Sequence, residues 1–338
     1  MNGQMLYEDF EKRYGKEKGE IVVYQAASPL MLFGSELARF HLPALGIGIA
    51  PPSMLALRTR SDGLFRIQTV HSNEEAFCRK ENLGNYHGNA FYQKIFSMLQ
   101  TLPPTLSGAD MLFYEQGDLE LFSHAASACA LAFWEETESE KLLTALGEED
   151  AACRTQTLVS LCAERNQALL LQDTQISKLP FCAEHEKIIL ITVEMKRKPE
   201  FSLDGIETLK ELSVAAEHNQ YAAFLLREAK RTGSAVRMIE HGKEKNLRIL
   251  LEDSTKDFLE TAGKEAQNLK TLYKLAAPHS NGCKAVGGIG LFCFVPNANT
   301  DQFLDLVHHA YQKKAGTPPA FYIGEMLESG KISDIKTE

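Results

Sequence analysis

Long apolar runs are missing from this sequence. Across its 338 residues, no stretch approaches the roughly 18 apolar residues that a membrane-spanning helix needs. Segment 1–20 is rich in charge and lacks the apolar core of a secretory signal peptide. We therefore expect no membrane partner and a cytoplasmic location.

Closely spaced cysteine pairs are also missing. The seven cysteines are scattered and odd in number, and no Cys-x-x-Cys pair occurs. This pattern argues against a disulfide framework and against a zinc site, so we expect no bound metal. The expected state of these side chains is a buried free thiol in a reducing compartment.

Basic charge is in deficit. Lys and Arg number 36 against 45 Asp and Glu, which gives a formal net charge of −9. A protein that binds nucleic acid needs a basic face for the phosphate backbone, so we expect no nucleic-acid partner. A small anionic ligand in a local basic pocket stays open. Hydrophobic residues at 44% and charged residues at 24% are ordinary for a globular protein.

Strand-like segments dominate the first half of the chain. A Ser-Asp-Gly turn at 61–63 predicts a hairpin between strands at 54–58 and 64–69. Apolar periodicity gives the other elements. The remaining predicted strands are 21–26, 110–114, 168–171, 188–193, 288–295 and 320–323, and the predicted helices include 7–14, 86–99, 125–134, 136–150 and 301–313.

The pattern changes from strand-rich to helix-rich near 172–179. Residues 201–272 are typical of long amphipathic helices, and a strand–helix–strand pattern closes the chain. A length of 338 residues favours two domains at about 150 residues each. We therefore predict an α+β protein with a first domain at 1–173 and a second at 174–338.

The order of these segments resembles that of galactokinases, in the GHMP family of small-molecule kinases. The resemblance covers nearly the whole chain, from YEDFEKRYG and VVYQAASPLMLFGSE through GADMLFYEQGDLE and AERNQALLLQDT. It is most specific in NGCKAVGGIGLFCFVPNANTDQF, where the family has a glycine-rich strand followed by a helix. The resemblance implies a two-lobe GHMP-kinase-like fold, with a mixed sheet and helices in the first lobe, a ferredoxin-like second lobe and an interdomain cleft.

The phosphate cradle of such kinases has no full counterpart here. Phosphoryl transfer needs backbone N–H groups around the phosphates, a metal, a cation and a carboxylate. Galactokinases build the cradle from a stretch like PLGAGLSSSAS, whereas segment 117–127 reads GDLELFSHAAS. Without glycines the backbone cannot readily turn several N–H groups onto one phosphate. Ser123 and Ser127 are the nucleotide-loop counterparts that remain, and a helix N-cap explains Ser123 equally well.

Catalytic groups are replaced as well. The resemblance places Pro29 where the family has its catalytic arginine, and Thr155 or Gln156 where it has its catalytic aspartate. None of these three side chains carries a charge. The resemblance therefore implies no catalytic residue in this chain, only degenerate positions.

The counterparts of the sugar site are also altered. Ser35, Glu36 and Ala38 fall in the segment where the family has its sugar-holding Glu-His-x-Asp, and Phe201 falls where it has a tyrosine. Two carboxylates and one hydroxyl are lost by this comparison.

One glycine turn persists near the C-terminus. Gly287, Gly288 and Gly290 are counterparts of the family's third, nucleotide-facing motif. A tight turn where a helix meets a strand explains them as well. The sequence alone leaves both interpretations open.

These replacements predict a galactokinase-like pseudokinase that binds a small ligand or a protein partner in the old cleft. The alternative is an ATP-dependent sugar or other small-molecule kinase with a rebuilt site, in which Lys284, Arg39, Arg58 and Glu36 take over the lost roles. ATP and Mg²⁺ would be its cofactors. A third hypothesis is an unrelated two-lobe α+β binding module. The ligand, the cofactor and the oligomeric state stay open.

Overall fold

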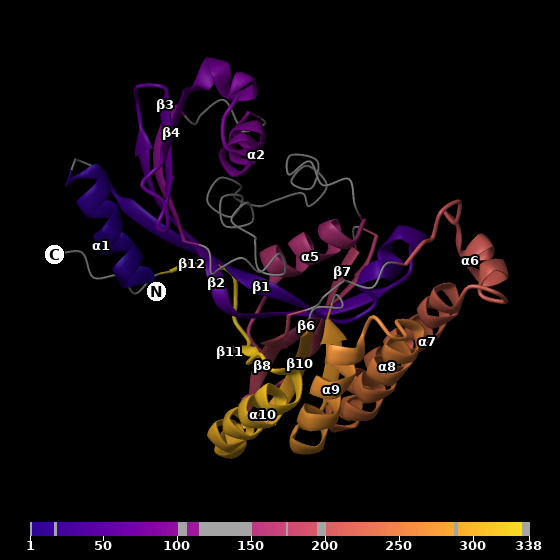
Figure 1. Cartoon of the computed structure of the whole chain (residues 1–338). Coiled ribbons are helices and arrows are strands. Elements are labelled where there is room, and N and C mark those ends of the chain that lie inside the picture. Colours follow the sequence, from indigo (N-terminus) through magenta and orange to yellow (C-terminus); the bar gives the residue numbers. More distant parts are fainter. Residues whose placement is uncertain are drawn as a thin grey trace. The chain divides into compact units, whose positions relative to one another are not determined.

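A computed structural model of the chain describes residues 2–16, 19–100, 107–114, 151–173, 175–194, 201–286 and 290–332 (Figure 1). The chain forms two compact units. Unit 1 comprises Met1–Pro29, Pro51–Glu164 and Leu327–Glu338, and unit 2 comprises Leu30–Ala50 and Arg165–Met326. These units are defined by packing rather than by sequence pattern, so the predicted division at 173/174 stays a prediction.

A sheet with strand order β12-β1-β2-β5-β3-β4 runs through unit 1. Its strands are β1 (Ile21–Phe33), β2 (Ala44–Arg60), β3 (Leu64–Thr69), β4 (Glu75–Arg79), β5 (Gly108–Tyr114) and β12 (Gly330–Lys331). Met111 of β5 pairs antiparallel with Leu57 on β2 and parallel with Ile67 on β3. Every residue of β5 is buried, as is typical of a central strand.

Strand β5 separates two strands that the sequence pairs in a hairpin. Gly63 has φ 76°, so the Ser-Asp-Gly turn is present. The chain leaves β2 there, but it re-enters the sheet as β3 on the far side of β5. The predicted hairpin between 54–58 and 64–69 is therefore wrong, and β3 forms its antiparallel pair with β4 instead. Burial of β5 between them outweighs the pairing that the local turn favours.

Helix α1 (Gly3–Tyr14) packs on this sheet by one apolar stripe. The Asn2 side chain caps its N-terminus, satisfying an N–H group that has no partner within the helix. Leu6, Phe10 and Tyr14 recur every four residues and are buried against the sheet. The other described helices of unit 1 are η2 (Lys80–Asn85), α2 (Ala90–Leu99) and α5 (Ala151–Cys162).

Unit 2 contains a four-stranded antiparallel sheet. Its strands are β8 (Glu186–Thr192), β9 (Cys283–Val286), β10 (Gly290–Pro296) and β11 (Ala320–Gly324). The spatial order β11-β8-β10-β9 is the fourth, first, third and second strand in chain order, which is the ferredoxin-like arrangement. This confirms the predicted α+β class. It also confirms the closing strand–helix–strand pattern, in which α10 (Thr300–Ala315) connects β10 to β11.

Helices cover one face of this sheet. The buried side chains of Leu272 on α9 and Val307 on α10 pack against Ile191 and Leu291 of the strands. Figure 1 shows α7 and α8 side by side next to them. The connection from β8 to β9 holds α6 (Leu209–Ala215), α7 (Gln220–Glu240), η4 (Glu244–Asn246), α8 (Leu247–Thr261), α9 (Gln267–Ala276) and η5 (Ala277–His279), and η6 (Asn297–Asn299) precedes α10.

The remaining part of unit 2 is a hairpin with a short helix. Strands β6 (Gln167–Gln172) and β7 (Gln175–Pro180) pair antiparallel, and β6 also pairs with the start of β2. The 3₁₀ helix η1 (Ser35–Phe40) connects β1 to β2. The end of β1, the whole of η1 and the start of β2 lie within Leu30–Ala50, which belongs to unit 2. The other parts of β1 and β2 belong to unit 1.

Candidate functional site

Three counterparts of catalytic residues lie in unit 1. Pro29 is buried in β1, Thr155 is 6% exposed in α5, and Gln156 is partly exposed on the same helix. Proline has no N–H group, and threonine and glutamine carry no charge. Side chains of these types cannot neutralise a transferring phosphoryl group. Their correspondence to the catalytic arginine and aspartate stays a prediction.

The sugar-site segment of unit 2 begins at a glycine that geometry requires. Gly34 has φ 80° and ψ 18°, and an added Cβ would lie 2.7 Å from the carbonyl oxygen of Pro43. The chain turns there into η1, which buries Leu37 and Phe40. Glu36 is left exposed.

Phe201 is connected to this segment by Tyr221, a residue that the sequence analysis did not identify. The Phe201 ring stacks on Tyr221, with 4.0 Å between centroids and 9° between planes. Tyr221 in turn packs on the cluster that includes Leu37. Burial raises the pKa of the Tyr221 hydroxyl, and the negative charge of Glu36 raises it further. Tyr221 thus stacks on Phe201 and lies within the electrostatic influence of Glu36, two of the predicted sugar-site positions.

The signal that could have indicated Tyr221 is local. Asn219 accepts hydrogen bonds from the N–H groups of Tyr221 and Ala222, at 2.9 and 3.1 Å. An Asn-x-Tyr sequence before an apolar run is typical of a helix start. The start of α7 therefore holds the tyrosine ring in place, but its stacking on Phe201 depends on tertiary packing.

Arg58, a candidate for a rebuilt cation, has a structural role in unit 1. It is 2% exposed and donates to the Asp110 carboxylate at 2.9 Å and to the Gly15 carbonyl at 2.8 Å. Arg60 and Arg66 bind the same carboxylate, at 3.1 and 2.7 Å. Burial alone would raise the pKa of Asp110, but its hydrogen bonds to Arg66 and Arg58 outweigh burial and lower the pKa.

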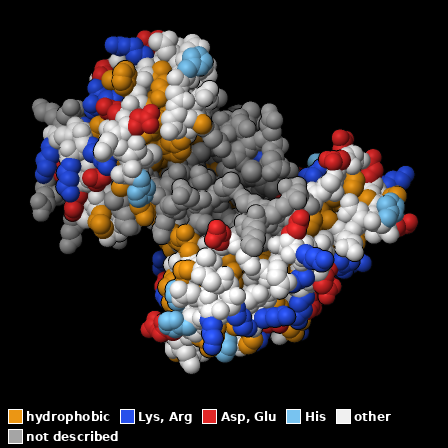
Figure 2. Space-filling view, viewed as in Figure 1, with side chains coloured by type: hydrophobic (Ala, Val, Ile, Leu, Met, Phe, Trp, Pro, Cys, Tyr) orange, Lys and Arg blue, Asp and Glu red, His pale blue; other side chains and the backbone are white. Residues whose placement is uncertain are grey.

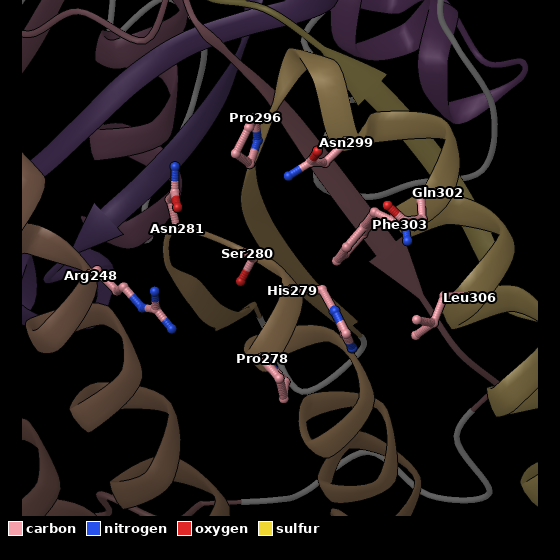
Figure 3. A pocket seen from close by; sticks show the side chains of 10 residues that line it. All are labelled: Arg248, Pro278, His279, Ser280, Asn281, Pro296, Asn299, Gln302, Phe303 and Leu306. Atoms are coloured by element: carbon pink, nitrogen blue, oxygen red, sulfur yellow. The ribbon is translucent and has the colours of Figure 1, made fainter.

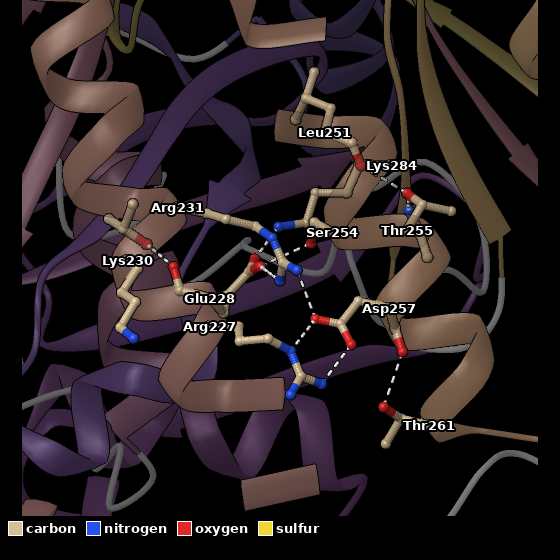
Figure 4. Close-up of polar contacts among 12 residues, drawn as sticks. Arg227, Glu228, Lys230, Arg231, Leu251, Ser254, Thr255, Asp257, Thr261 and Lys284 are labelled. Carbon is tan, nitrogen blue, oxygen red and sulfur yellow. Dashed lines mark hydrogen bonds and ion pairs between the residues drawn. The ribbon is translucent and has the colours of Figure 1, made fainter. Parts of the chain in front are cut away.

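Lys284, a second candidate, lies in a buried ionic network of unit 2 (Figure 4). Its ammonium group pairs with Glu228 of α7 and lies 4.3 Å from the centroid of the Phe33 ring. Burial lowers the pKa of Lys284, and the charge of Glu228 opposes that change. Because the Lys284 ammonium group is buried and paired, it cannot contact a ligand in solvent.

The network extends along α7 and α8 through two more arginines. Arg231 lies 3.4 Å from Glu228 and 2.5 Å from Asp257. Arg227 donates to both carboxylate oxygens of Asp257, from Nε at 2.7 Å and from Nη2 at 2.5 Å. Ser254 donates to the second oxygen of Glu228 at 2.8 Å. These bonds join α7, α8 and β9 across the interior of unit 2.

Of the nucleotide-loop counterparts, Gly290 is the one that the structure describes. An added Cβ there would lie 2.2 Å from the carbonyl oxygen of Ile191, so the sheet itself requires glycine at the start of β10. This supports the turn-and-strand interpretation for this position. Ser123, Ser127, Gly287 and Gly288 lie outside the described residues.

Exposed charges show a different distribution from these buried clusters. Acidic and basic side chains are intermixed on the face shown in Figure 2. Among the described residues, no group of three or more His, Cys, Asp or Glu side chains could hold a metal ion. None of the helices in the described ranges has the length and hydrophobicity to cross a membrane.

Neither a family sequence model nor a curated protein sequence matches the chain. Solved structures do match it. The galactokinase of Lactococcus lactis complexed with galactose aligns at a TM-score of 0.75 and 15% identity, covering 97% of this chain and 98% of that chain. The mevalonate kinase of Methanococcus jannaschii aligns at 0.63 and 12%, covering 93% and 100%. A putative sugar kinase of Campylobacter jejuni aligns at 0.55 and 12%, covering 94% and 99%.

These matches span almost the full length of each chain, so they concern the whole architecture rather than one shared subdomain. At 15% identity and below they show the fold, and the chemistry depends on the residues of the site. Two sheets, the second in ferredoxin-like order, agree with this likeness. The chain therefore has the α+β fold of the GHMP kinases.

Proposed function

We propose that the chain is a GHMP-kinase-like protein that does not phosphorylate galactose and acts by binding a small ligand or a protein partner. The observation that supports this is the state of Arg58 and Lys284. Both are almost fully buried, at 2% and 9% exposed, and each is paired with a carboxylate. Neither cation is available to a phosphoryl group.

The magnitude of the loss favours inactivity over slow catalysis. Removing one preorganised stabilising group typically costs about a hundred- to a thousand-fold in rate. Here the positions matched to the cation and the carboxylate hold Pro29 and Thr155 or Gln156. The two losses need not add, but either one alone would reduce turnover severely.

Coupled ADP release tests the proposal. The purified chain is assayed with galactose, ATP and Mg²⁺ at enzyme concentrations that detect a few turnovers per hour. A galactokinase in the same assay is the positive control. We expect no galactose-dependent ADP. Turnover on the order of 1 per second, near the low end for enzymes, would overturn the proposal.

A rebuilt kinase site is the second candidate, supported by the charges on η1. Glu36 and Arg39 are exposed there and both act electrostatically on Tyr221. In such a kinase ATP and Mg²⁺ are the cofactors. At 100 times its dissociation constant, a ligand adds about 2.7 kcal/mol to the stability of the folded state. A rise in melting temperature with ATP and Mg²⁺, together with ADP release that Arg39→Ala abolishes, would favour this candidate.

We also propose that the protein is cytoplasmic. Cys78, Cys162, Cys182, Cys283 and Cys293 carry free thiols. Unpaired thiols persist in reducing compartments and are uncommon in secreted proteins. Fractionation of cells that express the chain tests this location.

A further inference from the structure

A pocket of about 260 Å³ lies in unit 2, apart from the residues discussed above. Its wall is formed by the first turn of α8, by η5 and the two residues after it, by the end of β10 and by the start of α10 (Figure 3). All of these segments belong to unit 2. The volume is slightly below the roughly 300–1,000 Å³ of pockets for drug-sized ligands, so the space suits a smaller molecule.

Part of the pocket wall is apolar and firmly held. Phe303 is 2% exposed and forms part of the core of unit 2. Leu306, one turn further along α10, and Pro296 add partly exposed apolar surface to the lining. Apolar side chains like these have no hydrogen-bonding groups, so they can contact the C–H face of a ligand without leaving a polar group unpaired.

Polar groups line the pocket from both sides. Arg248 reaches into the pocket from α8, and Asn299 reaches toward it from the other side (Figure 3). The Nε of Arg248 donates to Glu252 at 2.7 Å. That bond fixes the guanidinium plane and leaves its two terminal nitrogens, with four N–H donors, for a ligand. The Gln302 amide adds a donor and an acceptor.

Arg248 supplies the positive charge of the lining, which includes no Asp or Glu. Its ion-pair partner Glu252 lies one helical turn away, outside the lining. The nearby carboxylate of Glu186 is bound by the Asn281 amide nitrogen at 2.6 Å. Asp301 belongs to the first turn of α10, outside the lining. The positive end of the α10 dipole lies across the pocket from Arg248 and also favours an anion.

We propose that this pocket binds a small polyhydroxylated anion, a polyol that carries one phosphate or carboxylate group. The anionic group binds the terminal nitrogens of Arg248, because a guanidinium fork matches both oxyanions in a two-pronged geometry. The hydroxyl groups bind the amides of Asn299 and Gln302, and the carbon face contacts the apolar lining at Leu306. This site is independent of the proposed function, since it neither requires nor excludes phosphoryl transfer.

Calorimetric titration of the full chain, without ATP, tests the proposal. The probes are glucose 6-phosphate and gluconate, which carry the two anionic groups, with glucose and inorganic phosphate as partial ligands. We expect at least one of the two polyol anions to bind at least tenfold more tightly than glucose and than inorganic phosphate. We also expect its affinity to fall as salt is raised, because salt screens the charge on exposed groups. Binding of glucose 6-phosphate but not gluconate would identify phosphate as the recognised anion, and the reverse would identify carboxylate.

Two matched variants separate this site from any other. Arg248→Met removes the guanidinium charge and keeps an unbranched side chain, and we expect it to weaken binding at least tenfold. Arg237→Met makes the same change on α7, at an exposed residue outside the lining, and should leave affinity unchanged. Arg248 is itself exposed, so both variants should keep the wild-type melting temperature. Asn299→Ala should weaken the polyol anions more than inorganic phosphate.

Three outcomes would overturn the proposal. They are no binding of either polyol anion, equal binding in the Arg248→Met variant, and equal loss in the Arg237→Met variant. None of these outcomes depends on ADP release, so the proposed function and this site can fail separately.

Discussion

Lys284 of β9 and Glu228 of α7, 56 positions apart in the chain, form a buried ion pair. The same carboxylate accepts a hydrogen bond from Ser254 of α8. One glutamate therefore connects two helices and a strand of unit 2. Because all of these groups are removed from water, each depends on its partners for compensation of its lost hydration.

A double-mutant cycle on this pair should show strong coupling. Glu228→Met alone leaves the Lys284 ammonium buried without its carboxylate, and we expect a loss of about 3–5 kcal/mol in unfolding free energy. Lys284→Met should cost less, because Arg231 and Ser254 still bind Glu228. The double variant should be more stable than the sum of the two single effects predicts.

Urea unfolding of the four proteins measures this coupling. Residues in contact commonly differ from additivity by about 0.5–3 kcal/mol. Additivity within the experimental error would mean that the pair contributes no specific interaction. Lys256→Met, on an exposed lysine of α8 with carboxylates 3.9 Å away, is the control for loss of a surface charge.

Asp110→Asn should destabilise the protein and reduce its sensitivity to acid. The pKa of Asp110 is lowered in the folded state, so its contribution to stability is complete above the unfolded pKa of about 4. That contribution is lost as the pH falls through the lower, folded pKa. The variant should therefore lose about 3–5 kcal/mol at pH 7 and much less near pH 2.

Unfolding free energies measured between pH 2 and 7 check the expectation for Asp110. Asp9→Asn, which removes a partly exposed pair with Arg13, is the control and should cost about 1 kcal/mol or less. Parallel pH profiles for wild type and Asp110→Asn would contradict the assigned role of the three arginines.

Two glycine-to-alanine changes should act in opposite directions. At Gly290 the new Cβ would lie 2.2 Å from the Ile191 carbonyl oxygen, so the sheet of unit 2 must distort and the protein should be destabilised. Gly233 lies inside α7 with nothing within 4 Å of a new Cβ. Gly233→Ala should add about 0.5–1 kcal/mol, because alanine loses less conformational freedom in a helix. Thermal unfolding of both variants measures the change in stability. An unchanged melting temperature for Gly290→Ala would show that β10 tolerates a shift away from β8.

Pro29→Arg should not restore galactose phosphorylation. By the predicted correspondence, the new guanidinium would still lack a catalytic carboxylate, because the position matched to the aspartate holds Thr155 or Gln156. Coupled ADP release with and without galactose measures the effect, and a circular dichroism spectrum confirms that the variant folds. Turnover gained from this single change would show that the arginine was the one missing group.

The sequence predicts the sheet of unit 2 better than that of unit 1. Around β10, α10 and β11 the strands and helix follow one another, and short-range periodicity marks each of them. In unit 1 the turn at Gly63 is equally clear, but β5 enters between β2 and β3 from a distant part of the chain. Local turn preferences contain no information about such an insertion.

The sequence also predicts only some properties of the site residues. The absence of charge at Pro29, Thr155 and Gln156 can be read directly from the sequence, because it needs no geometry. The burial of Arg58 and Lys284 could not be predicted, since it depends on Asp110 and Glu228, partners 52 and 56 positions away. Arg248 could not be predicted as a site residue, because its pocket is formed by segments that are separate in the sequence.

Unit 1 is completed by a strand that follows all of unit 2 in the sequence. Strand β12 pairs with β1 through Lys331 and Tyr24, and the whole of Arg165–Met326 lies in unit 2. During translation, β1 is therefore synthesised long before β12, and this edge of β1 stays unpaired until Lys331 has left the ribosome. Synthesis of β12, rather than of the other strands of unit 1, is the event that closes this sheet edge.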